Sequence, residues 1–182
     1  MDLTKKIKPL EREDWLGYKL VFNYTANSYY DVQIDKEDTG FNVSFEKKNF
    51  ETPILKTDEV IDQLFAPRWD DIKAWGIVED GKLLAVVETV VESWNNRLRV
   101  TELWVDDSLH RQGLGTALMD IAINRAKEEA RRVVVLETQT CNENAINFYL
   151  AYGFSLIGFD SCAYKNNDIQ RKEVRIELGL FL

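Results

Sequence analysis

The chain has 182 residues, the length of one domain, and 45% of them are hydrophobic, enough to build a core. Acidic residues number 31 against 23 basic ones, so the formal net charge is −8. An acidic surface repels nucleic acid and anionic lipid and attracts cations. We therefore expect no nucleic-acid partner, no membrane partner and a cationic substrate.

The cysteines and the N-terminus favour a cytoplasmic protein. Cys141 and Cys162 are too few for a disulfide framework and indicate reduced thiols. No apolar run follows Met1, and no stretch has the length of a membrane span. His110 is the only histidine. A Cys–His nucleophile pair and a zinc site are therefore disfavoured, and we expect no metal.

Residues 1–70 carry the weakest pattern. A strand is expected near Lys6–Lys8 and a helix over Trp15–Tyr24. The segments Tyr29–Val32 and Phe41–Phe50 are aromatic and charged without a clear period, and they stay unassigned.

From residue 72 onwards the pattern becomes regular. Ala74–Val78 is a short apolar run, and Asp80-Gly81 is a hairpin turn signal before a second strand over Leu83–Val91. A turn at residues 93–96 leads to a third strand over Leu98–Val105. These features predict an antiparallel meander.

The period then changes to that of an amphipathic helix over Gly113–Ala130. Val133–Leu136 follows as an unbroken apolar run, which suits a parallel strand buried on both faces. Strand, helix and strand together predict a right-handed βαβ unit. The apolar residues at helical spacing are Leu114, Ala117, Leu118, Ile121 and Ala122.

A second helix is expected after Asn142 as N-cap, with Gly153 as its stop. Strands are expected over Phe154–Phe159 and Glu173–Phe181. The predicted class is α+β, with a mixed, mostly antiparallel central sheet flanked by helices and one parallel βαβ unit. The terminal strand could also pair across a homodimer.

The segment His110-Arg111-Gln112-Gly113-Leu114-Gly115-Thr116 joins a strand to a helix. The first turn of a helix offers free N–H groups and the positive end of the dipole, and glycines let an anion approach the backbone closely. The alternative is a tight turn with no ligand. Neither G-x-x-x-x-G-K-[ST] nor G-x-G-x-x-G is present, which disfavours P-loop and dinucleotide folds.

Two stretches together resemble the GNAT superfamily of N-acyltransferases. Leu103-Trp104-Val105, then five residues and R-Q-G-L-G-T, is similar to that family's acetyl-CoA pyrophosphate motif. N-x-x-A-x-x-F-Y from Asn142 to Tyr149, followed by Gly153-Phe154, is similar to its second cofactor motif. One departure is His110, at a position where the family usually has Arg or Gln. Within the superfamily, Leu136–Gln139 and Phe159–Tyr164 look most like the streptothricin acetyltransferases.

The resemblance implies a single GNAT-like domain over residues 1–182. Residues 1–70 would be its acceptor-side region, 74–165 its CoA-binding core and 173–181 its terminal strand. It also implies acetyl-CoA as cosubstrate. The residues that match the family's cofactor-binding positions are Leu103, Trp104, Val105, His110, Arg111, Gln112, Gly113, Leu114, Gly115, Thr116 and Asn142.

Acyl transfer to an amine needs a neutral amine, and a lysine-like amine is neutral in only about one molecule in 10³ at pH 7. Glu102 is the candidate base, on a strand face that it is expected to share with Val100 and Trp104. The alternatives are an exposed or ion-paired glutamate near Arg97 or Arg99, or an anchor for a cationic substrate.

Tyr149 falls where many family members use a tyrosine to protonate the leaving thiolate, so the resemblance makes it the candidate acid. The alternative is a core aromatic residue. Asn142 would contact the pantetheine arm, or only cap its helix. The family pattern also implies an oxyanion donor among the backbone N–H groups near Leu103–Val105.

The favoured function is an acetyl-CoA-dependent N-acetyltransferase that acts on a primary amine of a small cationic acceptor, such as a streptothricin-like antibiotic. Two alternatives stay open. One is a protein or peptide N-acetyltransferase, and the other is a non-catalytic acyl-CoA sensor module.

Overall fold

The computed structural model describes residues 3–57 and 62–182, and the chain divides into two compact units. Unit 1 takes the described residues of 1–22, 58–136 and 180–182, and unit 2 takes residues 23–57 and 137–179. Within the described ranges, no helix is long and apolar enough to cross a bilayer.

Unit 1 is built on a mixed sheet with the strand order β1-β6-β7-β8-β9. The first three ladders are antiparallel, and β8 pairs with β9 in parallel. The predicted meander and the parallel strand after the helix are confirmed. The strands are β1 (Lys8–Leu10), β6 (Lys73–Glu79), β7 (Lys82–Glu92), β8 (Arg97–Val105) and β9 (Val133–Gln139, which ends in unit 2).

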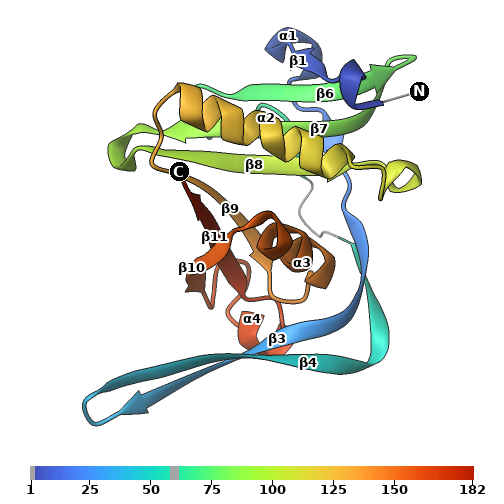
Figure 1. Ribbon diagram of the computed structural model, residues 1–182. Helices are drawn as coiled ribbons and strands as arrows, with labels where there is room; N and C mark the ends of the chain where they lie inside the picture. The colour runs from blue at the N-terminus through green and yellow to red at the C-terminus, as the bar shows by residue number, and fades with distance from the viewer. Residues whose placement is uncertain (1–2, 58–61) are drawn as a thin grey trace. The chain divides into compact units, whose positions relative to one another are not determined.

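Helix α2 (Leu114–Glu128) lies across one face of this sheet, over β6, β7 and β8 (Figure 1). Leu118 and Ala122, two of the apolar residues at helical spacing, are completely buried. The helix predicted over Gly113–Ala130 is therefore confirmed, with Gly113 as its N-cap.

The N-terminal part of unit 1 differs from its prediction. The helix expected over Trp15–Tyr24 is wrong, because α1 (Arg12–Trp15) ends there. Gly17 adopts a left-handed φ of +76° and donates its N–H to the carbonyl of Leu64, which turns the chain away. The short strands β2 (Lys19–Leu20) and β5 (Asp62–Gln63) follow, and η1 (Leu3–Lys6) stands where the first strand was expected to begin.

These N-terminal segments contribute to an apolar cluster of unit 1. Its buried members come from β1, β2, β6, β7 and the stretch after β5. Trp104 of β8 packs against it and donates its indole N–H to the carbonyl of Val21 at 3.0 Å. The buried members are Leu10, Leu20, Leu64, Phe65, Ala74, Leu83 and Val86.

A buried arginine fastens the end of α2 to the sheet. Arg125 donates to the side chain of Thr89 on β7 at 2.7 Å and to the carboxylate of Glu129 at 2.9 Å. Glu129 also accepts from Lys73 and Arg131, each at 3.1 Å. Burial raises the pKa of Glu129, but the hydrogen bonds from Arg125 and Lys73 outweigh it and bring the pKa to about 2.

Glu129→Gln is expected to weaken the protein at neutral pH by about 1–2 kcal/mol, allowing for solvent screening. Because the folded-state pKa is depressed, the contribution of Glu129 is present above the ordinary value of 4.5 and is lost as pH falls towards about 2. Urea unfolding across this window should show a smaller loss of stability in E129Q than in the wild type. The exposed neighbour Glu128→Gln is the control, and equal acid sensitivity of E129Q and the wild type would contradict the assignment.

Unit 2 contains a long antiparallel hairpin of β3 (Asn23–Glu37) and β4 (Gly40–Thr57) (Figure 1). The sequence pattern left this region unassigned. Toward the turn, one face of the hairpin carries the apolar pairs Val32↔Phe45 and Ile34↔Val43, and the other carries polar pairs such as Asp35↔Asn42. The hairpin is therefore amphipathic in that part.

The other strands of unit 2 and the helix before them follow the prediction. Antiparallel strands β10 (Ser155–Asp160) and β11 (Arg175–Phe181) pair back on each other, in the strand order β9-β11-β10. Helix α3 (Glu143–Tyr152) precedes β10, and a short helix α4 (Asp168–Arg171) precedes β11. The expected α+β fold with a mixed, mostly antiparallel sheet is confirmed.

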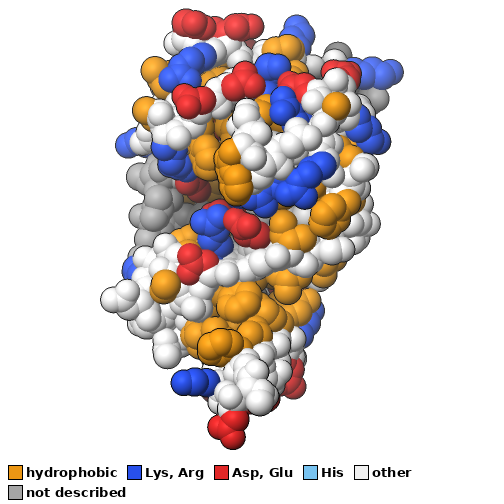
Figure 2. Space-filling view, turned by 90° about the vertical axis from the view of Figure 1, so that its left-hand side faces the viewer, with side chains coloured by type: hydrophobic (Ala, Val, Ile, Leu, Met, Phe, Trp, Pro, Cys, Tyr) orange, Lys and Arg blue, Asp and Glu red, His pale blue; other side chains and the backbone are white. Residues whose placement is uncertain are grey.

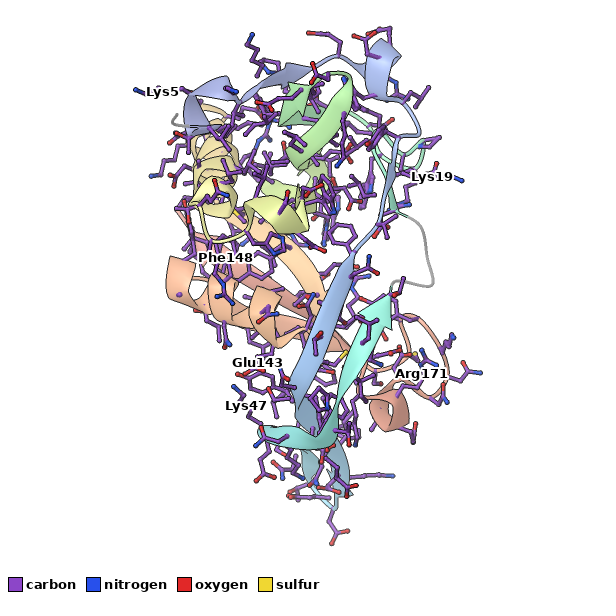
Figure 3. All side chains as sticks on the ribbon, turned by 90° about the vertical axis from the view of Figure 1, so that its right-hand side faces the viewer. Lys5, Lys19, Lys47, Glu143, Phe148 and Arg171 are labelled. Carbon is purple, nitrogen blue, oxygen red and sulfur yellow. The ribbon has the colours of Figure 1, made fainter. Side chains whose placement is uncertain are left out.

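The hairpin is tied to the other elements of unit 2 by ion pairs. Lys47 of β4 contacts Glu143 in the first turn of α3 at 2.6 Å (Figure 3). Asp31 of β3 accepts from Lys48 at 2.8 Å and from Lys172 at 2.6 Å, and these contacts lower the pKa of Asp31. The middle of the hairpin is thus tied to α3 and to Lys172 by ion pairs.

The apolar face of the hairpin becomes exposed toward the turn. Phe41 is 75% exposed, whereas Phe45 packs edge-on against Phe159 of β10 at 5.3 Å. Figure 2 shows a group of hydrophobic side chains, in orange, at the surface in the lower half of that view. The homodimer stays a prediction.

Candidate active site

The loop from β8 to α2 is ordered by local hydrogen bonds. It contains one turn of 3-10 helix, η3 (Asp107–Leu109). Asp106 begins this turn by accepting from the backbone N–H and the hydroxyl of Ser108, at 3.1 Å and 2.6 Å. Lys82 contacts the same carboxylate at 3.1 Å. The chain leaving β8 therefore has a defined direction.

His110 is folded back onto the end of β8. Its Nε2 lies 2.8 Å from the carbonyl oxygen of Val105. A carbonyl can only accept, so Nε2 carries a hydrogen. This hydrogen bond ties the loop back to the strand. The ring stays half exposed, and its Nε2 lies 3.6 Å from a carboxylate oxygen of Asp107. The next residue, Arg111, has a left-handed φ of +61° and an exposed side chain.

Gly113 is the N-cap of α2 and has a φ of +80°. A Cβ added there would meet no heavy atom within 4 Å, so the space in front of the glycine is open. Leu114 is buried, and Gln112 and Thr116 are exposed. The first turn of α2 therefore presents its N–H groups beside open space, as an anion site requires.

Strand β8 is paired on one edge along its length but only briefly on the other. It pairs with β7 from Arg97 to Val105. In the described residues, the parallel ladder to β9 covers only Arg97–Arg99. The edge of β8 over residues 100–105, which includes Leu103, Trp104 and Val105, runs on without β9 toward the glycine loop.

Glu102 is 5% exposed, and a β-bulge sets its direction. Glu88 pairs with Glu102 and the next residue of β7, Thr89, pairs with Val100, so Thr101 is the extra residue. Thr89 faces α2, because Arg125 bonds its hydroxyl. Val100 and Glu102 therefore point to opposite faces.

The expectation that Glu102 shares a face with both Val100 and Trp104 is thus half wrong. Trp104 pairs with Val86, two residues from Glu88, so it does share the face of Glu102. The bulge displaces Val100 to the α2 side. The alternative of an exposed glutamate also fails, since Glu102 is buried. Arg97 and Arg99 both contact Glu92, at 3.1 Å and 2.6 Å, and the ion-paired alternative stays open.

A second carboxylate, which the sequence analysis missed, lies on the same face. Glu88 of β7 is fully buried and accepts from the backbone N–H of Phe65 at 2.6 Å and from the hydroxyl of Thr101 at 2.9 Å. Burial raises the pKa of Glu88, against the effect of these two donors. The available signal was a lone acidic residue within the apolar run Leu83–Val91.

In unit 2, Asn142 caps α3 as predicted. Its side-chain oxygen accepts from the backbone N–H of Ala145 at 3.2 Å. Gly153 ends the helix with a φ of +112° and donates to the carbonyl of Tyr149 at 3.2 Å. Both predicted boundaries of α3 are confirmed, and the N-capping role of Asn142 leaves a ligand contact as a prediction.

Tyr149 lies on the buried side of α3. It is 9% exposed, and its ring lies 5.4 Å from that of Phe148 and 5.9 Å from that of Phe154. The position therefore fits a packed aromatic residue. Its hydroxyl chemistry stays a prediction.

Cys141 lies just before Asn142 and is buried. Burial raises the pKa of its thiol, despite the hydroxyl of Tyr24 at 3.3 Å. Such a thiol is a poor nucleophile. Across the described residues, no group of three or more His, Cys, Asp and Glu side chains could hold a metal ion.

The expected site residues thus fall into two groups. Glu102 to Val105 and His110 to Thr116 lie together on β8 and the start of α2 in unit 1. Asn142 and Tyr149 lie together on α3 in unit 2.

A mixed sheet with one parallel βαβ unit and a glycine loop at the start of its helix is the arrangement that the resemblance implied. The model of the acetyltransferase (GNAT) family matches residues 39–154, and this chain belongs to that family.

Streptothricin acetyltransferases are among the relatives of this chain. The streptothricin acetyltransferase of Streptomyces lavendulae is 31% identical over 86 residues, 47% of this chain and 46% of that protein. Streptothricin acetyltransferase A of Bacillus subtilis (strain 168) is 30% identical over 106 residues, 53% of this chain and 61% of that protein. The matches thus span roughly half to three fifths of these relatives.

Two solved structures share the fold over nearly the whole chain. Nourseothricin acetyltransferase superposes with a TM-score of 0.73 at 21% identity, covering 97% of this chain and 98% of that one. A putative streptothricin acetyltransferase of Bacillus anthracis str. Ames, in complex with acetyl coenzyme A, superposes with a TM-score of 0.71 at 20% identity, covering 97% and 96%.

Proposed function

We propose that this chain transfers the acetyl group of acetyl-CoA to a primary amine of a small cationic acceptor of the streptothricin type. The observation that carries the proposal is the course of β8. The strand parts from β9 after Arg99 and leads into a loop whose glycine, Gly113, borders open space at the N-terminus of a helix.

These features fit CoA. The N–H groups of the first turn of α2 would hold the pyrophosphate, with the exposed Arg111 beside them. The unpaired edge of β8 over Leu103–Val105 would hold the extended pantetheine arm by backbone hydrogen bonds. Bound acetyl-CoA would supply an activated acetyl thioester, and the Bacillus anthracis protein with the same fold was solved with acetyl coenzyme A.

Glu102 would take the proton of the attacking amine. It is a buried carboxylate on the strand that leads to the loop, and burial makes a carboxylate a stronger base. A backbone N–H near Leu103–Val105 would stabilise the oxyanion. Tyr149 would protonate the leaving thiolate, and Asn142 would steady the pantetheine arm. These last two roles depend on the motif in α3.

Two facts support the class of acceptor. The curated relatives act on streptothricin by name, and the chain's net charge of −8 favours a cationic partner. Because the matches span only part of those relatives, the acceptor is a proposal about this chain.

The test is thiol release from acetyl-CoA by the purified protein with a panel of amines: streptothricin, aminoglycosides, polyamines and short peptides. Release that depends on streptothricin or a related small cation supports the proposal. Release only with peptides would establish a peptide N-acetyltransferase. Tight acetyl-CoA binding without release would indicate a sensor module.

Glu102→Gln is expected to lower kcat about tenfold near neutral pH and to flatten the acidic limb of the pH–rate profile, because the side chain can no longer take a proton. Equilibrium titration with acetyl-CoA should give a nearly unchanged Kd. A variant with wild-type kcat and an unchanged profile would reduce Glu102 to a structural residue.

A further inference from the structure

Unit 1 contains a second buried carboxylate that the proposed mechanism does not use. Glu88 and Glu102 face each other across the β7–β8 ladder, at the bulge, on the side of the sheet away from α2. Both are almost fully buried, at 0% and 5% exposure. Two carboxylates at facing positions of adjacent strands lie close enough to influence each other's charge.

Two hydrogen bonds to the carboxyl group of Glu88 favour its charged form, while burial, the larger effect, raises its pKa. One carboxylate oxygen accepts the N–H of Phe65 at 2.6 Å, and the other accepts the hydroxyl of Thr101 at 2.9 Å. A backbone N–H can only donate. Arg68 and Arg12 also favour the charged form, against the cost of burial. Ala74 faces Glu88 from β6 and brings no charge.

The same contacts fix the backbone around Glu102. Thr101 is the bulged residue immediately before it, so the bond to Glu88 holds the bulge that directs Glu102. Phe65 has a left-handed φ of +56°, which a non-glycine residue rarely adopts, and its N–H is fastened to the same carboxylate.

We propose that Glu88 is a positioning residue for Glu102: it fastens the bulge at Thr101 and places a second carboxylate opposite the candidate base. A neighbouring negative charge favours the protonated form of Glu102 and makes it a stronger base. This inference depends on the proposed role of Glu102.

Glu88→Gln removes the charge and keeps the shape. The acidic limb of the pH–rate profile is expected to move to lower pH by about one unit, the size expected for two like charges on facing residues, and kcat to fall. Glu88→Asp keeps the charge but is one methylene too short to reach both donors. It should keep the wild-type profile and lose only kcat.

The matched control is Glu92→Gln on the same strand. Glu92 is also a partly buried carboxylate in contact with β8, through Arg97 and Arg99. E92Q should change stability but leave the profile where it is in the wild type. Thr101→Val removes one hydrogen bond of Glu88 without altering any charge. It takes the place of E88Q in the test if E88Q fails to fold.

A carboxyl carbon-13 NMR titration of Glu102, identified through its absence in E102Q, needs no acceptor. A midpoint that moves to lower pH in E88Q, but not in E92Q, supports the inference. An unchanged midpoint in E88Q overturns it. A wild-type protein that transfers acetyl to no amine would sink the proposed function, while this titration still decides the role of Glu88.

Discussion

Gly113→Val is expected to weaken acetyl-CoA binding at least about 100-fold, or about 2.7 kcal/mol. The branched side chain would project into the open space in front of α2, where the pyrophosphate is proposed to lie. It would also strain the backbone, because φ at this position is +80°. Isothermal titration with acetyl-CoA measures the loss.

Gly81→Val provides a matched control. Gly81 lies in the β6–β7 turn with a φ of +77°, and an added Cβ there also meets nothing within 4 Å. Both variants should lose similar stability in thermal unfolding. Only the variant at Gly113 should lose affinity. Equal affinity in the two folded variants would place the pyrophosphate elsewhere.

Tyr149→Phe is expected to lower kcat about 10²-fold while the Kd for acetyl-CoA changes less than about twofold. The change removes a hydroxyl and keeps the ring that packs against Phe148 and Phe154. Steady-state kinetics with the acceptor found in the amine panel, together with equilibrium binding, separates the two quantities.

Tyr152→Phe is the control for this prediction. Tyr152 lies three residues later on α3, and its ring is 6.1 Å from that of the same Phe154. It should keep wild-type kcat. If Tyr149→Phe also keeps wild-type kcat across the pH range, the acid must be another group or a water molecule.

The βαβ unit could be predicted closely because its signals are local. Val133–Leu136 is an unbroken apolar run, and apolar residues repeat at helical spacing from Leu114 to Ala122. The cap residues Asn142 and Gly153 act within one turn of α3, so sequence order alone places them. Glycine loop and caps were therefore found without the structure.

The N-terminal part resisted prediction because its elements depend on distant partners. Phe41, Val43 and Phe45 do alternate with polar residues, but charged residues surround them and the pairing strand lies on the far side of a turn. The region 15–24 was misjudged because Gly17 turns the chain to meet Leu64, a contact that helical spacing cannot show.

The direction of Glu102 could not be predicted either. A bulge adds one residue to one strand and reverses the alternation beyond it. The extra residue, Thr101, becomes recognisable only when β7 and β8 are paired. Glu88 was missed for the same reason, since its proposed role depends on Glu102, which lies opposite it only once the two strands are paired.

The long hairpin has a consequence for how fast unit 1 can assemble. Strand β1 must find β6, with Leu10 opposite Ala74, and the chain between them includes the whole hairpin. Closing so long a loop costs entropy that grows with the logarithm of its length. A hairpin can form from its turn in microseconds, before distant strands meet.

Once its two strands are paired, the hairpin holds its two ends side by side, since Asn23 is paired with Thr57. The loop that β1 and β6 have to close is then shorter by most of the residues between those ends. The hairpin, which contributes no expected catalytic or cofactor-binding residue, would in this way speed the folding of the sheet that carries the glycine loop.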